Sequence, residues 1–110
     1  MTPDWNKVMG IEYIAHTRAQ MTPEQTVAFV SEFVAQPDWY VLQRDSHKIS
    51  FLFSGTKPRP NGPEDFRLEI SDGEVYIVFY GGTRAQENHV MAFIRHSLSS
   101  KGVDIELEEP

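Results

Sequence analysis

The tetrapeptide Thr-Arg-Ala-Gln occurs twice in this chain, at residues 17–20 and at residues 83–86. A strand-like apolar run precedes each copy, and an amphipathic helical pattern and then another extended segment follow it. Because four matching letters can arise by chance, the inference rests on the shared order of these segments. The sequence therefore predicts two strand–helix–strand units with extra strands between them.

The length of 110 residues fits one domain, since typical domains contain about 100–150 residues. We predict a single domain over 1–110, with an N-terminal arm at 1–8 and a Pro- and Gly-rich loop at 55–64. The chain has no cysteine, which excludes disulfides and thiolate chemistry. The sequence shows no signal-peptide pattern and no apolar run long enough to span a membrane, so we expect a cytoplasmic protein without membrane association.

Ten basic and sixteen acidic side chains give a net charge of −6. Direct nucleic-acid binding is not expected, because phosphate backbones require a basic surface. An acidic surface instead favours a basic protein as the partner. The simpler alternative is that the negative charge only aids solubility.

The first helix has clear boundary signals. Thr22 suits the N-cap and Pro23 suits the first helical position, while Gln25 completes a capping box with Thr22. The Gln-Pro step at 36–37 ends the helix, since proline disfavours helical backbone in the residue before it. The predicted apolar stripe consists of Val27, Val30, Phe33 and Val34, widened by Phe29.

The second helix repeats this logic. Thr83 suits the N-cap with Gln86 three residues later, and Lys101 followed by Gly102 suits the C-terminal end. Its predicted apolar face consists of Val90, Met91, Ile94 and Leu98, with Phe93 at the margin.

Two predicted hairpins and two further strand-like segments accompany these helices. The step Asp72-Gly73 favours a tight hairpin, and counting outward pairs three sets of apolar residues on one face: Ile70 with Val75, Leu68 with Ile77, and Phe66 with Phe79. An earlier hairpin joins 39–44 to 49–54, where we place Tyr40 and Leu42 on the same face as Phe51 and Phe53. Outside these hairpins, strands are predicted at 9–15 and 103–109.

The predicted element order is β-α-β-β-β-β-α-β. Two right-handed strand–helix–strand crossovers place both helices on the same face of one sheet. We therefore predict an α+β, two-layer sandwich of ferredoxin-like character, with a mainly antiparallel sheet and an inserted pair of strands.

The sequence shows no catalytic signature. The four histidines lack metal-ligand spacing, and neither nucleophile-elbow nor phosphate-loop motifs occur. We predict no catalytic residues, no metal, no cofactor and no enzyme activity. The rival hypothesis is a small enzyme or anion-binding domain that uses the junctions at 16–20 and 81–86. Its residues would be Gly82, Thr83 and Arg84 at a helix start, together with Arg18 and His16. Alternatively, the glycines serve only the backbone conformation.

The last predicted strand carries acidic residues on its outward side. Asp104, Glu106 and Glu108 would form an acidic ridge, with Tyr76 and Tyr80 as aromatic anchors beside it. Lys57 and Arg59 in the 55–64 loop could also contact a partner. The alternatives are that the charges protect a sheet edge and that the loop is a solvated linker.

These features favour a small acidic module that binds a basic protein. A concrete form is a bacterial immunity protein that neutralises a cognate toxin by direct binding, since toxins that cut nucleic acid tend to be basic. A third hypothesis is an accessory domain that forms homodimers through exposed aromatic side chains.

Overall fold

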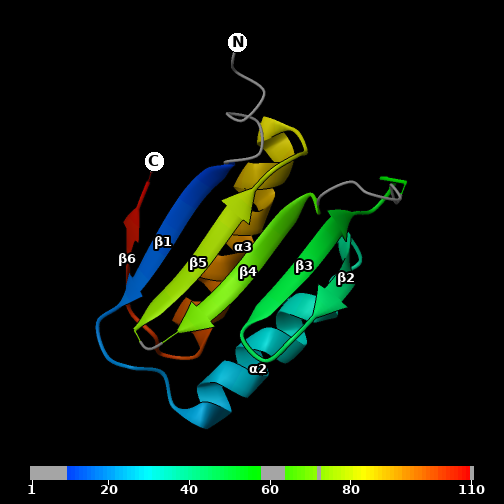
Figure 1. Cartoon of the computed structure of the whole chain (residues 1–110). Coiled ribbons are helices and arrows are strands. Elements are labelled where there is room, and N and C mark those ends of the chain that lie inside the picture. The colour runs from blue at the N-terminus through cyan, green and yellow to red at the C-terminus, as the bar shows by residue number, and fades with distance from the viewer. Residues whose placement is uncertain (1–9, 58–63, 72, 110) are drawn as a thin grey trace.

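The computed structural model describes residues 10–57, 64–71 and 73–109. The predicted arm at 1–8 lies outside these ranges, as do Arg59, Asp72 and most of the predicted 55–64 loop. The elements, in chain order, are β1 (Ile11–Thr17), α2 (Pro23–Val34), β2 (Trp39–Arg44), β3 (Lys48–Phe53), β4 (Phe66–Ser71), β5 (Glu74–Phe79), α3 (Arg84–Ser100) and β6 (Ile105–Glu108). The α+β class and the predicted element order are confirmed (Figure 1).

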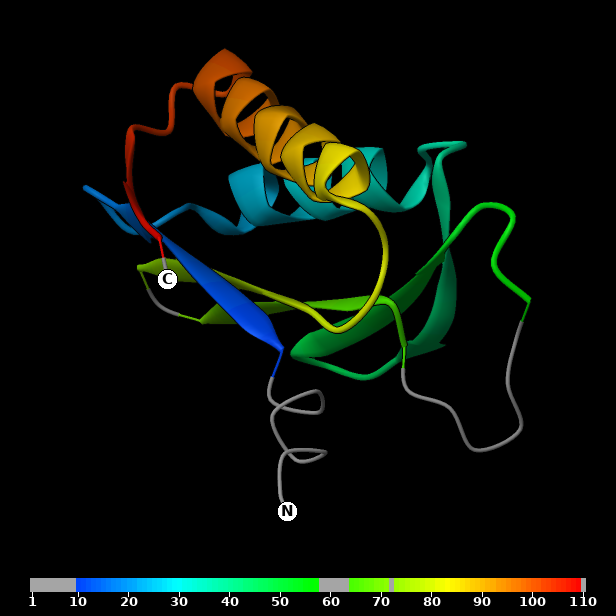
Figure 2. The ribbon, with the colours of Figure 1, turned by 90° about the horizontal axis from the view of Figure 1, so that it is seen from above.

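The six strands form one sheet in the order β2-β3-β4-β5-β1-β6, and every neighbouring pair is antiparallel. Strands β5 and β6 flank β1 and run in the same direction, since each is antiparallel to it. Helices α2 and α3 both lie on one face of the sheet, and among the described residues the other face carries no helix (Figure 2). The first strand begins two residues later than predicted, because Gly10 has a φ of 72° and interrupts the extended backbone.

The β4–β5 hairpin has the predicted register. Phe66 pairs with Phe79, Leu68 with Ile77 and Ile70 with Val75. Alternate residues of a strand point to opposite faces, so these side chains face the helices and form the floor of the core. Phe33 of α2 packs over this floor, with its ring centroid 5.1 Å from that of Phe51 and 6.1 Å from that of Phe66.

Both helices begin with the predicted capping boxes, at Thr22 with Gln25 and at Thr83 with Gln86. The apolar face of α3 is buried as predicted, but the stripe of α2 is only partly so. Phe29 and Phe33 are fully buried, whereas Val27 is 65% exposed. The first turns of α2 extend past the ends of the strands (Figure 1).

The predicted face of Tyr40 and Leu42 is wrong. Tyr40 pairs with Leu52, while Trp39 and Val41 pair with Phe53 and Phe51. The register shifts between Val41 and Gln43, so Leu42 lies in a bulge of the edge strand. Trp39 enters the core instead, and Tyr40 and Leu42 are 39% and 43% exposed.

Candidate acidic binding surface

The helix-free face of the sheet carries carboxylates on its β1–β6 side. His16 of β1 pairs with Glu74 of β5 on one side and with Glu106 of β6 on the other. Because paired residues share a face, their side chains form a row across three strands. Glu108 of β6 lies in the next row, and Glu12 lies further along β1. We call Glu12, Glu74, Glu106 and Glu108 the acidic face.

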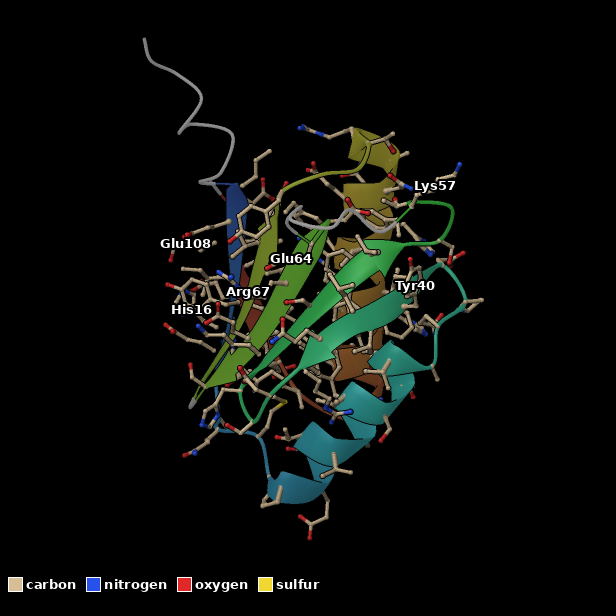
Figure 3. The ribbon with its side chains drawn as sticks, turned by 45° about the vertical axis from the view of Figure 1, so that its right-hand side comes forward. His16, Tyr40, Lys57, Glu64, Arg67 and Glu108 are labelled. Carbon is tan, nitrogen blue, oxygen red and sulfur yellow. The ribbon has the colours of Figure 1, made fainter. Side chains whose placement is uncertain are left out.

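His16, which is a cation when protonated, lies at the centre of this face. Its Nε2 lies 2.9 Å from Glu108 Oε1, and its Nδ1 lies 3.4 Å from Glu74 Oε2. The hydrogen bond to Glu108 raises the pKa of His16. Desolvation opposes this effect, and the negative charges of Glu74, Glu108 and Glu106 add to the rise. Figure 3 shows His16 and Glu108 side by side. One histidine therefore faces several carboxylates, and the face keeps a negative charge even when His16 is protonated.

The neighbouring carboxylates on β4 have their own cation. Arg67 Nε lies 2.8 Å from Glu69 Oε2, and its Nη1 lies 3.4 Å from Glu64 Oε2. The guanidinium also lies over the ring of Tyr80, 5.5 Å from its centroid. The carboxylates near β4 are thus closer to neutral, so the uncompensated negative charge is concentrated on the acidic face.

The residues predicted to bind a partner form two groups, one at or beside the acidic face (Tyr76 and Asp104, with Glu106 and Glu108) and one away from it (Tyr80 and Lys57). Tyr76 pairs with Ile14, which itself pairs with Glu108, so Tyr76 lies two strands from β6, about 10 Å across the sheet. Asp104 is exposed directly before β6. Tyr80 is half-buried and already contacts Arg67. Lys57 lies at the opposite side of the sheet from Glu108 (Figure 3).

The structure does not bring the two repeated junctions together. Arg18 follows the end of β1, whereas Arg84 begins α3 after the end of β5, which pairs with the beginning of β1. A single anion site that uses both junctions would require them to converge, and the full length of β1 separates them. Gly82 has a φ of 92° and Thr83 caps α3, so these two residues serve the turn and the helix start.

A buried carboxylate near this junction was missed at the sequence level. Glu87 is 8% exposed, and its Oε1 has no hydrogen-bond partner. Burial raises the pKa of Glu87, and the charge of Arg84 partly opposes this. The signal was its spacing: residues 87, 91, 94 and 98 share one helical face, and the last three are the apolar Met91, Ile94 and Leu98.

Glu87 lines a cavity of about 420 Å³ at the end of the sheet where β1 begins and β5 ends. The other lining residues are Gly10, Ile11, Phe79, Tyr80, Gly81 and Gly82.

Two other hollows, of about 560 and 350 Å³, adjoin each other between α2 and the β2–β3 turn. They share Thr26, His47 and Ile70, and the smaller hollow has a largely aliphatic floor. Asp45, which lines the smaller hollow, accepts hydrogen bonds from the backbone N–H groups of His47 and Lys48. That carboxylate therefore shapes the turn and is already occupied.

Within the described ranges, no three histidine or carboxylate side chains are arranged to hold a metal ion. None of the helices in those ranges has the length and apolar character that a transmembrane segment requires. Comparison with protein-family models, with curated proteins and with solved structures finds no significant match to this chain.

Proposed function

We propose that this chain is a small binding protein whose acidic face docks onto a basic protein. The observation that carries the proposal is the set of carboxylates around His16, where Glu74, Glu106 and Glu108 have a single half-exposed histidine between them. A surface of this kind attracts cationic partners over a distance and excludes acidic ones.

Two further features support docking by the sheet face. The acidic side chains stand on three paired strands, so their spacing is fixed by backbone hydrogen bonds rather than by a loop. Rigid placement lowers the entropy lost on binding. Tyr76 lies in the same part of the face, and tyrosine is enriched among residues that contribute most to binding.

A concrete form of this function is an immunity protein that acts in the cytoplasm and covers the active site of a nucleic-acid-cutting toxin. The acidic face would then occupy the site that normally binds phosphates. We also propose a ferredoxin-like relationship for the fold, since removal of β3 and β4 leaves the order β-α-β-β-α-β. A toxin gene beside the gene for this chain would favour the immunity function, whereas an operon of metabolic enzymes would count against it.

The binding function is tested by charge reversal at two matched positions. Glu106→Lys changes the acidic face, and Glu24→Lys makes the same change of net charge at an exposed position on α2. Proteins captured from the source cells by the wild type are identified, and their dissociation constants are measured for each variant. We expect basic partners whose affinity falls on the order of fivefold for Glu106→Lys and little for Glu24→Lys.

The triple variant Asp104→Lys, Glu106→Lys, Glu108→Lys should abolish this binding. Unchanged affinity in the triple variant would disprove docking by the acidic face. Equal losses for Glu106→Lys and Glu24→Lys would also count against it, because they would show an effect of net charge alone.

A further inference from the structure

The side chain of Glu87 is the one carboxylate in the described ranges that is both buried and left with an unpartnered oxygen. Its Oε1 is fully shielded and receives no hydrogen bond. A carboxylate in this state loses hydration without gaining a partner, which is unfavourable unless something else supplies the missing donor. The charge of Arg84 lowers the pKa of Glu87 and so partly opposes the effect of burial.

The cavity beside Glu87 has the chemistry of a site for a long basic side chain. Ile11, Phe79 and Tyr80 supply apolar surface, and Glu87 is the sole ionisable carboxylate among the described lining residues. Lysine and arginine combine an apolar stem with a cationic head, so they match an apolar wall with a carboxylate at one point. An anion would instead be repelled by ionised Glu87.

Gly10 and Gly82 allow close packing of the backbone beside the cavity. A Cβ atom on Gly10 would lie 2.8 Å from the carbonyl oxygen of Phe79, and one on Gly82 would lie 2.4 Å from the ring of Phe53. Side chains at these positions would have to displace these neighbours. The volume of about 420 Å³ falls within the usual range for pockets that hold small groups, about 300–1,000 Å³.

The cavity lies at the end of β1, the strand that also carries part of the acidic face. Gly10 and Ile11 line the cavity, and the next residue of β1 is Glu12, whose side chain points to the helix-free face. A partner that binds the acidic face and extends around the beginning of β1 would reach the cavity. We propose that the cavity at the start of α3 receives a lysine or arginine side chain of the basic partner, with Glu87 as its counter-ion. This inference rests on the proposed function and names the anchoring contact within it.

The test uses a ligand pair that differs in charge alone. The probes are the blocked tripeptide Ala-Arg-Ala and its citrulline counterpart, which has a similar shape and no charge. Binding to the full chain is followed by amide chemical shifts in two-dimensional NMR. We expect the arginine probe to shift the amides of Gly10, Ile11, Gly81 and Gly82 at millimolar concentration, and the citrulline probe to shift them little.

The matched protein variant is Glu87→Gln, which keeps the size of the side chain and removes its charge. It should fold, because a neutral amide is less unfavourable in a buried position than a carboxylate. The arginine probe should then lose its localised shifts, and a captured basic partner should bind on the order of thirtyfold more weakly. Shifts that persist in Glu87→Gln, or none in the wild type, would overturn the inference.

The two proposals fail in different ways. If Glu106→Lys weakens partner binding while Glu87→Gln leaves it unchanged, the acidic face stands and the anchoring contact is refuted. If the arginine probe binds at Glu87 but no basic partner depends on Glu106, the cavity is a cation site and the proposed function is refuted.

Discussion

The carboxylate of Asp65 accepts a hydrogen bond from the backbone N–H of Phe53, with 3.0 Å between Phe53 N and Asp65 Oδ2. The backbone of Asp65 also donates to Phe51 O and accepts from the N–H groups of Tyr80 and Gly81. One residue, only 3% exposed, therefore joins the end of β3, the beginning of β4 and the end of β5.

Replacing Asp65 with alanine should destabilise the fold by about 2–3 kcal/mol, because the buried N–H of Phe53 would lose a charged acceptor. Asp65→Asn keeps an oxygen acceptor and should cost less. Urea unfolding followed by circular dichroism measures both variants. A cost of less than about 0.5 kcal/mol for Asp65→Ala would show that water replaces the carboxylate without loss.

Gly82 and Gly102 form a matched pair for testing the turn before α3. Both have positive φ, 92° and 75°, so alanine would be strained at either position. A Cβ on Gly82 would in addition meet the Phe53 ring at 2.4 Å, whereas none of the surroundings of Gly102 lies within 4 Å of its added Cβ. We expect Gly102→Ala to cost about 1 kcal/mol and Gly82→Ala about 2–4 kcal/mol in free energy of unfolding. Equal costs would show that the Phe53 ring moves aside freely.

The sequence predicted correctly those features that depend on neighbouring residues alone. The capping residues Thr22 and Thr83 fixed both helix starts, and the alternation around Asp72 and Gly73 fixed the β4–β5 register. The bulge at Leu42 has no such signal, because it arises from how the edge strand fits its neighbour. The prediction of which face of the sheet Tyr40 occupies was consequently wrong.

The candidate site was predictable only in part, for a related reason. Glu106 and Glu108 could be placed on the outward side of a strand from alternation alone. Their closeness to His16 and Glu74 depends on β1 lying between β5 and β6, and strand order is not written in local sequence. Glu87 resembles the usual acidic residue in the first turn of a helix, and only its spacing from Met91, Ile94 and Leu98 indicated that it is buried.

Glu32 links the two helices and should give the chain an acid-dependent stability. Its Oε1 accepts hydrogen bonds from Ser97 Oγ at 2.6 Å and from Lys101 Nζ at 2.9 Å. These bonds, Ser97 first, lower the pKa of Glu32 below its usual value of 4.5. A lowered folded-state pKa means that the stabilisation is present above pH 4.5 and is lost as the pH falls through the folded value.

Ser97→Ala should raise the pKa of Glu32 and cost about 1 kcal/mol at neutral pH. Ser99→Ala, at an exposed position on the same helix, is the control for helix propensity. NMR titration of the Glu32 carboxyl carbon, together with urea unfolding, checks both effects. Equal stabilities of the two variants would mean that Ser97 contributes only through its helix position.

As the pH rises and His16 loses its proton, the stability of the fold should fall and its affinity for a basic partner should rise. Its hydrogen bond to Glu108, with the charges of Glu74 and Glu106, raises its folded-state pKa above 6.5. The resulting stabilisation is complete below pH 6.5 and is lost as the pH rises through the folded value. Over the same interval the acidic face loses its cation, so affinity for a basic peptide should rise.

Glu108→Gln should lower the pKa of His16 more than Glu74→Gln does, since the Glu108 hydrogen bond is the largest cause. NMR titration of the His16 ring in wild type and both variants measures this order, and oligo-lysine binding at several pH values measures the affinity. A His16→Gln variant should show neither pH effect, and a wild type whose affinity falls as His16 deprotonates would contradict the placement of the binding surface at this cluster.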